Sequence, residues 1–206
     1  MSLPISITTD ASTRLTVRLA IARDYETLEI EWLAHPELSS DARSFPWADF
    51  GKEPGSAAAD TWIFLSGNRC VVLVDPARAE EAIEGFLATS VASCSELPLS
   101  QLTGRALYIE YVAVAPWNQP GPARRHSVGS LLLDYSAFEA EARCDAQVGL
   151  HALHRPRLED WYRAQGLQDR GYDFAKFPED PLRYCYFEGG ADWVVPRSIA
   201  FKARVV

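Results

Sequence analysis

The chain has 206 residues, a net charge of −8, 48% hydrophobic residues and 23% charged residues. This acidic balance argues against a general nucleic-acid or anionic-membrane binder, because chains held to phosphates by counterion release carry a basic surplus. The apolar content excludes intrinsic disorder and is ample for one domain spanning residues 1–206. No basic stretch followed by a long apolar run opens the sequence, so we expect a cytoplasmic protein that makes no membrane contact.

The metal-binding residue types are spread along the chain. The four cysteines lie far apart, with no CxxC pair: Cys70, Cys94, Cys144 and Cys185. His151 and His154 lie close together, but no third ligand is near them in sequence. The sequence therefore predicts neither a disulfide framework nor a metal site. We expect one of the two histidines to be packed and the other to be exposed.

In the first half, residues 14–21 alternate as a strand does, and the next apolar residues, Tyr25, Leu28 and Trp32, follow helical spacing. Residues 36–60 are rich in Ser, Pro, Gly and Ala but include aromatic residues, which predicts an irregular segment that packs on the fold. Residues 61–65 and 70–74 flank a Gly-Asn turn and predict a hairpin.

A helix is predicted for residues 76–92. Pro76 is favoured at a first helical position, and the apolar residues behind it share one helical stripe. A strand pair running past this segment is the alternative.

The second half predicts alternating strands and helices. Residues 106–116 form a nearly all-apolar strand stopped by Pro116, and an amphipathic helix follows from Ser130 to Cys144. Residues 147–153 form the next strand, and a short helix then ends at Gly166. Residues 182–195 are typical of a strand, a Gly-Gly turn and a second strand. The fold class is therefore mixed α/β.

The loop between Pro116 and Ser130 is the most informative segment for function. Residues 111–133 contain no Asp or Glu. A helix N-terminus presents unpaired N–H groups, and small residues let a phosphate approach them, so this loop suits a phosphate ligand. A solvated arginine loop is an equally good interpretation of this segment alone. The P-loop, GxGxxG and GxSxG patterns are absent, which disfavours NTPases, Rossmann oxidoreductases and α/β-hydrolases.

These residues resemble the GCN5-related N-acetyltransferase (GNAT) family. Val114-Ala115-Pro116 is similar to the family's V-x-P strand end, and residues 124–130, RRHSVGS, are similar to its R/Q-x-x-G-x-G/A loop. Trp161, Tyr162 and the Gly-Leu pair at 166–167 resemble a later family signature, and residues 17–28 resemble its opening strand and helix. The resemblance is strongest over 105–170. Ser127 stands where the family usually has Gly, and His154 stands near a common Asn.

The resemblance implies an α+β fold with one central, twisted, mostly antiparallel mixed sheet. The sheet would be flanked by helices and splayed between strands 106–116 and 147–153, with a β-bulge in the first of these strands. It also implies acetyl-CoA as the acyl donor, with pantetheine on the strand backbone and pyrophosphate on the loop. The implied cofactor-binding residues are Val112, Ala113, Val114, Arg124, Arg125, His126, Ser127, Val128, Gly129 and Ser130.

Two residues stand out as candidate catalysts. Glu110 is a carboxylate inside an apolar strand, which is costly unless it is paired, hydrated or functional. The resemblance implies that Glu110 is the general base and that Tyr162 protonates the departing thiolate. Other interpretations remain open for both residues. Glu110 could form an ion pair at the solvent-exposed end of the strand, and Tyr162 could belong to the buried stripe of a short helix. Trp161 is expected in the core.

The implied activity is acetyl transfer from acetyl-CoA to a primary amine by direct attack, the acceptor being an amine-bearing small molecule or a protein amine. The alternative is a GNAT-fold CoA-binding or regulatory protein without transferase activity. The strand-like segment 184–206 could pair two copies into a homodimer. Several residues lie where the family places acceptor-site elements, but a core role is equally open for them: Trp32, His35, Trp47, Asp49 and Phe50.

Overall fold

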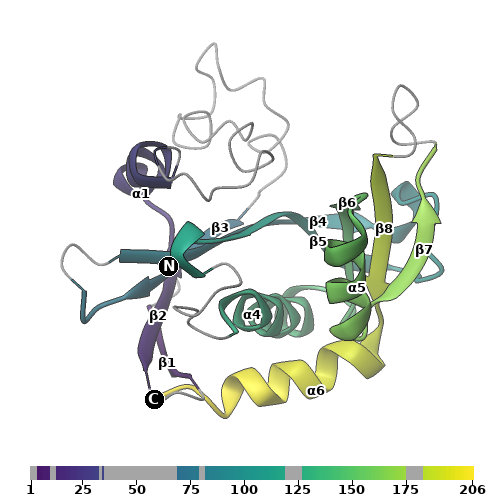
Figure 1. The fold of residues 1–206 in the computed structure, drawn as a ribbon. Coiled ribbons are helices and arrows are strands. Elements are labelled where there is room, and N and C mark those ends of the chain that lie inside the picture. The colour runs from purple at the N-terminus through teal and green to yellow at the C-terminus, as the bar shows by residue number, and fades with distance from the viewer. Residues whose placement is uncertain are drawn as a thin grey trace. The chain divides into compact units, whose positions relative to one another are not determined.

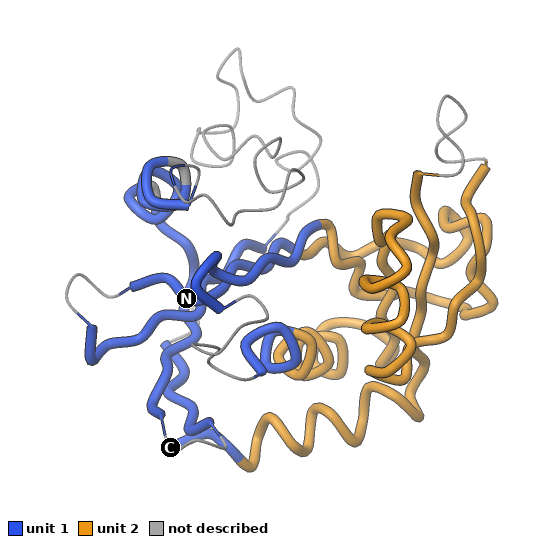
Figure 2. Tube along the Cα trace, viewed as in Figure 1, with its two compact units in different colours: residues 1–88, 111–132, 204–206 blue, residues 89–110, 133–203 orange. Residues whose placement is uncertain are grey.

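The computed structural model describes residues 4–9, 13–32, 34, 69–78, 82–118, 127–174 and 183–206. It is an α+β fold with one eight-stranded, mostly antiparallel sheet in the order β1-β2-β3-β4-β5-β6-β8-β7, flanked by helices (Figure 1), which confirms the predicted fold class. The chain divides into two compact units (Figure 2). Unit 1 holds residues 1–88, 111–132 and 204–206, and unit 2 holds residues 89–110 and 133–203.

Unit 1 begins with an antiparallel pair, β1 (Ile5–Thr8) and β2 (Arg14–Leu19), and β2 also pairs with β3 (Arg69–Asp75). Helix α1 (Ala22–Thr27) continues into a π-helical turn, η1 (Leu28–Trp32). Tyr25, Leu28 and Trp32 are buried with the β3 and β4 side chains, which confirms the predicted strand and helical spacing. Residues 36–60 and the first strand of the predicted hairpin, 61–65, lie outside the described residues.

The predicted helix over residues 76–92 is wrong. Ala82–Ser93 forms the strand β4, which lies between β3 and β5 in the sheet. Its residues from Ile83 to Ser90 are all buried, so both faces of the strand are covered. A strand buried on both faces loses the polar alternation that would identify it, and its apolar residues then fit a helical stripe by coincidence.

Most of the predicted elements in the second half of the chain are confirmed. Strand β5 (Arg105–Val114) leads to the short helix η3 (Pro116–Asn118), and α4 (Val128–Arg143) precedes β6 (Val148–Leu153). Helix α5 (Pro156–Ala164) ends before Gly166, whose φ of +85° is the expected left-handed turn. Three further elements are η2 (Cys94–Glu96), β7 (Gln168–Tyr172) and β8 (Tyr184–Gly189).

The second predicted strand of segment 182–195 is wrong, because the chain after Gly190 forms the helix α6 (Ala191–Lys202). Trp193, Ser198 and Phe201 are buried along it. The start of α6 contains Trp and Val, residue types that favour strands. A segment that ends at residue 195 therefore resembles a strand. Strand β8 pairs with β6 on one side and β7 on the other, so it offers no open edge for pairing two copies. Homodimer formation stays a prediction.

The register of β5 and β6 agrees with the predicted splay. The two strands pair in parallel at three positions, Leu107 with Val148, Tyr108 with Gly149 and Ile109 with Leu150. Strand β5 continues to Val114, and β6 continues to Leu153. Glu110 is therefore the first β5 residue beyond this pairing. No helix in the described part of the chain is long and apolar enough to cross a membrane.

Candidate active site

The second half of β5 has the character expected of a strand that receives a ligand. Residues 106–109 are buried, whereas residues 110–114 are all half-buried. The segment from Val112 to Val114 is thus partly accessible although β5 is an interior strand of the sheet. An extended segment of this kind can hydrogen-bond a ligand in the manner of an added strand. These residues are the predicted pantetheine positions.

Helix α4 begins at Val128, directly after a residue with an unusual backbone. Ser127 has a φ of +79°, and its carbonyl accepts the Leu131 N–H at 2.7 Å. This left-handed conformation is the one that favours glycine. No acidic residue lies in the first turn of α4, which leaves the positive end of the helix dipole unopposed there. The loop residues before it, Arg124, Arg125 and His126, lie outside the described residues.

The Ser127 backbone yields a testable prediction. A serine at positive φ costs about 1–2 kcal/mol, and a β-branched residue costs more. We expect Ser127→Gly to keep or slightly raise the free energy of unfolding, and Ser127→Val to lower it by about 1–2 kcal/mol. Urea unfolding of both variants measures this. A Ser127→Val variant as stable as the parent would show that Ser127 does not need the left-handed conformation.

A glycine in β4 allows the start of α4 to lie close against the sheet. A Cβ built on Gly85 would lie 2.9 Å from both Val128 Cγ1 and Leu132 Cδ1, and 3.4 Å from the Ala113 carbonyl oxygen. A side chain at position 85 would therefore displace the first turns of α4 or crowd the end of β5. Because Gly85 has no side chain, the two predicted cofactor-binding segments of unit 1 can lie close to β4.

A buried carboxylate fixes the exit from β5. Glu84 is fully buried in β4 and accepts hydrogen bonds from Trp117 Nε1 at 3.0 Å and from Asn118 Nδ2. Arg78 Nη1 also donates to Glu84 at 3.0 Å, and its guanidinium stacks over the Trp117 ring. The Glu84 backbone carbonyl accepts the N–H of Ala115 at 2.9 Å. Together these bonds hold η3, from which the chain enters the loop before α4.

We expect Glu84→Ala to destabilise the protein by about 3 kcal/mol, because it removes the carboxylate that accepts from the Trp117 and Asn118 side chains. Glu84→Gln keeps the shape but loses the charge and one acceptor, so a smaller loss is expected. Thermal and urea unfolding of the two variants give these values. If Glu84→Ala were to cost less than about 1 kcal/mol, the anchoring of η3 would not depend on this carboxylate.

Glu110 lies at the point where the pairing of β5 with β6 ends. Its side chain is half-buried, and its Oε1 accepts a hydrogen bond from Ser90 Oγ of β4 at 2.6 Å. The hydroxyl holds one carboxylate oxygen in place. A carboxylate that is oriented and only partly hydrated suits a general base. Ser90 could not be singled out from the sequence, since its contact with Glu110 arises from the pairing of β4 with β5.

A buried relay of polar side chains lies next to Glu110 in unit 2. Tyr108 OH lies 2.5 Å from His151 Nδ1, and His151 Nε2 lies 3.0 Å from Asp173 Oδ2. Burial raises the pKa of Tyr108, with a smaller contribution from the charge of Glu110, so the phenol keeps its proton at neutral pH.

This relay was missed by sequence reasoning, which expected only that one histidine would be packed and the other exposed. The side chain of His151 is buried, and that of His154 is largely exposed, which confirms that expectation. Asp173 follows β7, a short strand without an apolar alternation.

Tyr162 lies on α5 and is 4% exposed. Its ring packs on Phe187 of β8, with centroids 5.4 Å apart, and on Trp161 at 4.9 Å. Burial raises the pKa of Tyr162, so the phenol stays protonated at neutral pH and is able to donate. Trp161 is half-buried rather than a core residue. The roles of Glu110 and Tyr162 in catalysis stay predictions.

Among the predicted acceptor-site residues, Trp32 is fully buried in unit 1 and packs edge-on against Trp117, with centroids 6.5 Å apart. It is a core residue. The other residues predicted for the acceptor site, His35, Trp47, Asp49 and Phe50, lie outside the described residues.

Comparison with known proteins identifies the fold. No family model and no curated protein matches the sequence. Among solved structures, an uncharacterised protein from Bacillus halodurans has a TM-score of 0.66 at 12% identity, covering 97% of this chain and 96% of that one. Apo FdhC, a nucleotide-linked sugar GNAT, has a TM-score of 0.56 at 12% identity, covering 100% of both chains.

Naa20 from Chaetomium thermophilum, solved with a bisubstrate analogue, has a TM-score of 0.51 at 17% identity, covering 88% of this chain and 90% of that one. At these identities the similarity is one of fold. The chain therefore has the GNAT fold, as the resemblance implied.

Proposed function

From a GNAT fold and the residues placed on it, we propose that the protein transfers an acetyl group from acetyl-CoA to a primary amine. The observation that supports this most is the course of β5. Its pairing with β6 ends at Ile109, and a hydrogen-bonded carboxylate, Glu110, follows at once. A partly accessible strand segment, Val112–Val114, comes next. Function on a shared fold is set by such local chemistry.

Acyl-CoA binding would use two segments of unit 1. Pantetheine would pair with the backbone of Val112, Ala113 and Val114, and pyrophosphate would lie on the backbone N–H groups from Arg125 to Ser130. Two features of the structure fit an anionic group at the second segment. The α4 N-terminus has no acid in its first turn, and Ser127 turns the backbone into the helix. Arg124, Arg125 and His126 would add positive charge.

The chemistry needs no nucleophile from the protein. The amine attacks the thioester carbonyl, so a C–N bond forms and the C–S bond breaks. Glu110 takes the proton that the ammonium loses, and Tyr162 gives one to the departing thiolate. Backbone N–H groups near Val112 would stabilise the oxyanion. Naa20, which has the same fold, was solved in complex with a bisubstrate analogue, which supports the proposal of two bound substrates.

The acceptor would be an amine-bearing small molecule or a protein amine in the cytoplasm. The net charge of −8 favours a cationic acceptor, because long-range attraction speeds its encounter with an acidic protein. The acidic balance of the chain argues against nucleic acids and anionic membranes as partners.

Calorimetric titration with acetyl-CoA tests the proposal. We expect the parent to bind, and a variant with Arg124→Ala and Arg125→Ala to bind at least about tenfold more weakly, because hydrogen bonds to charged groups are worth about 1.5–3 kcal/mol. Gly129→Leu should also weaken binding, by blocking approach to the helix N-terminus. The matched control changes the exposed Arg14 and Arg23 to Ala and should bind as the parent does. A parent that does not bind acetyl-CoA would end the proposal.

A CoA-binding protein without transferase activity is the second candidate. The observation that favours it is the deep burial of Tyr162 against Phe187, which a purely structural aromatic would also show. Binding of acetyl-CoA without release of free CoA across a broad panel of amines would identify this function.

A further inference from the structure

Three side chains that bind metals in proteins meet in unit 2, apart from the proposed transfer chemistry. His154 directly follows β6, Glu159 lies in the first turn of α5, and Cys185 lies in β8. One ligand atom from each lies within 4.8 Å of the others. No metal site was predicted from the sequence, because no third ligand is close to the histidines along the chain. The third ligand, Cys185, comes from a strand that is brought beside β6 by the sheet.

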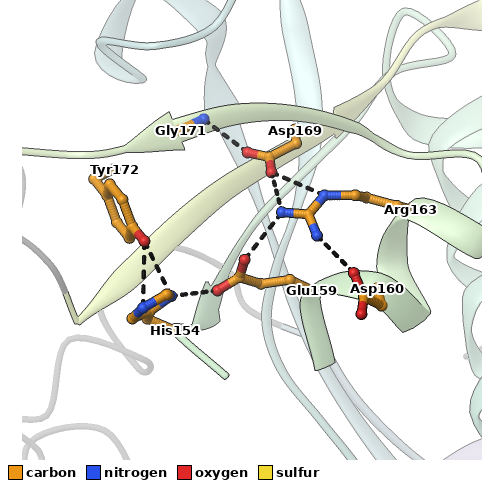
Figure 3. Close-up of polar contacts among 7 residues, drawn as sticks. All are labelled: His154, Glu159, Asp160, Arg163, Asp169, Gly171 and Tyr172. Carbon is orange, nitrogen blue, oxygen red and sulfur yellow. Dashed lines mark hydrogen bonds and ion pairs between the residues drawn. The ribbon is translucent and has the colours of Figure 1, made fainter. Parts of the chain in front are cut away.

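Glu159 contacts His154 with one carboxylate oxygen and Arg163 with the other (Figure 3). Its Oε1 lies 2.5 Å from His154 Nδ1, and its Oε2 accepts a hydrogen bond from Arg163 Nη2 at 2.9 Å. Tyr172 OH lies 3.1 Å from the same Nδ1 of His154. Arg163 thus fixes one carboxylate oxygen and leaves the other directed at the histidine. A partner on the far oxygen is the usual way in which a protein orients a ligating carboxylate.

The burial of the three side chains is graded. Cys185 is 3% exposed, the Glu159 side chain is 8% exposed, and the His154 side chain is 42% exposed. Two ligand groups are therefore held inside the fold, and the third is at the surface.

The charge around the cluster also favours a cation. Arg163 forms ion pairs with three carboxylates, those of Glu159, Asp160 and Asp169, at 2.9, 2.8 and 2.6 Å. One guanidinium against three carboxylates leaves a local charge of about −2, which attracts a cation. Figure 3 shows these acids gathered around the guanidinium beside His154.

We propose that His154, Glu159 and Cys185 bind a zinc-type transition-metal ion. The ligands would be Nδ1, Oε1 and Sγ, with water in the fourth position. A mixed nitrogen, oxygen and sulfur donor set suits Zn²⁺ and disfavours Mg²⁺ and Ca²⁺, which prefer oxygen ligands. Binding releases the Cys185 thiol proton to solvent, and the proton between Nδ1 and Oε1 moves to Nε2 of His154, so that Nδ1 can bind the ion. Two such atoms on one tetrahedral ion lie about 3.3 Å apart, so the exposed His154 ring moves outward slightly.

The ion would have a structural role, because it would link the turn after β6, the first turn of α5 and β8. Co²⁺ replaces Zn²⁺ in such sites and gives a thiolate-to-metal charge-transfer band in the near ultraviolet. Titrating the reduced, metal-free full chain with Co²⁺ should produce this band at one ion per chain. Adding Zn²⁺ should abolish it and should raise the melting temperature.

Cys185→Ser should remove the band and weaken Zn²⁺ binding at least about tenfold. Cys94→Ser, at a buried cysteine outside the cluster, is the matched control and should behave as the parent does. His154→Gln changes an exposed side chain, so this variant should fold normally. It should also lose Zn²⁺ affinity, and that loss cannot be attributed to disruption of β8. Failure of the parent to produce the band would overturn the proposal. So would a Cys185→Ser variant that binds Zn²⁺ as tightly as the parent.

Discussion

Replacing Tyr162 by phenylalanine is expected to lower kcat for acetyl transfer by about 10²–10³-fold, while the Kd for acetyl-CoA changes by less than about twofold. The substitution keeps the ring that packs on Phe187 and Trp161 and removes only the hydroxyl. If this phenol protonates the departing thiolate, its loss affects the transition state and not the bound ground state. Steady-state kinetics with calorimetry separates the two quantities.

Tyr135→Phe is the matched control for the Tyr162 variant. Tyr135 is also a buried phenol, which donates to Glu139 on the same helix, so its loss removes a structural hydrogen bond alone. We expect it to keep kcat within about twofold. Equal activity of the parent and the Tyr162→Phe variant would dismiss the acid role and leave Tyr162 as a packing residue.

The raised pKa of Tyr162 has a further consequence at alkaline pH. Its folded-state pKa lies above the ordinary value of 10.0, so its contribution to stability is complete below pH 10 and is lost as pH rises further. The parent should therefore lose unfolding free energy more steeply above pH 10 than Tyr162→Phe does. Urea unfolding between pH 8 and 11 measures this difference. Parallel curves for the two proteins would contradict it.

Sequence patterns predicted helix α5 and strand β2 and missed strand β4. Helix α5 and strand β2 alternate with their own periods and have clear ends, so their positions follow from local chemistry. Strand β4 has no solvent-exposed face over residues 83–90, and α4 packs against it at Gly85. Such burial is a property of the assembled sheet, and no local pattern shows it.

The same distinction applies to the candidate site. Glu110 could be singled out from the sequence because a carboxylate within an apolar strand is unusual. Its partner Ser90 could not, since a serine in a buried strand is ordinary until β4 and β5 are placed side by side. Cys185 is a comparable case, because its ligand neighbours come from the turn after β6 and from α5. Contacts between strands distant in sequence require the topology.

Replacing Glu110 by glutamine is expected to lower kcat/KM for the amine by about 10²-fold at neutral pH. Glutamine has the same shape, and its amide oxygen can accept the Ser90 hydrogen bond, so β4 and β5 keep their contact. The loss should shrink as pH rises toward about 10, the ordinary pKa of an alkyl amine, because the acceptor then arrives already deprotonated. The ratio of parent to variant rates between pH 7 and 10 measures this.

Ser90→Ala separates orientation of Glu110 from its chemistry. The carboxylate remains but loses the donor that fixes Oε1, so we expect a loss of about tenfold in kcat that does not shrink as pH rises. A Glu110→Gln deficit that stays constant from pH 7 to 10 would mean that Glu110 does not take the amine proton. In that outcome the carboxylate would only position the acceptor, and KM for the amine, rather than kcat, would show most of the effect.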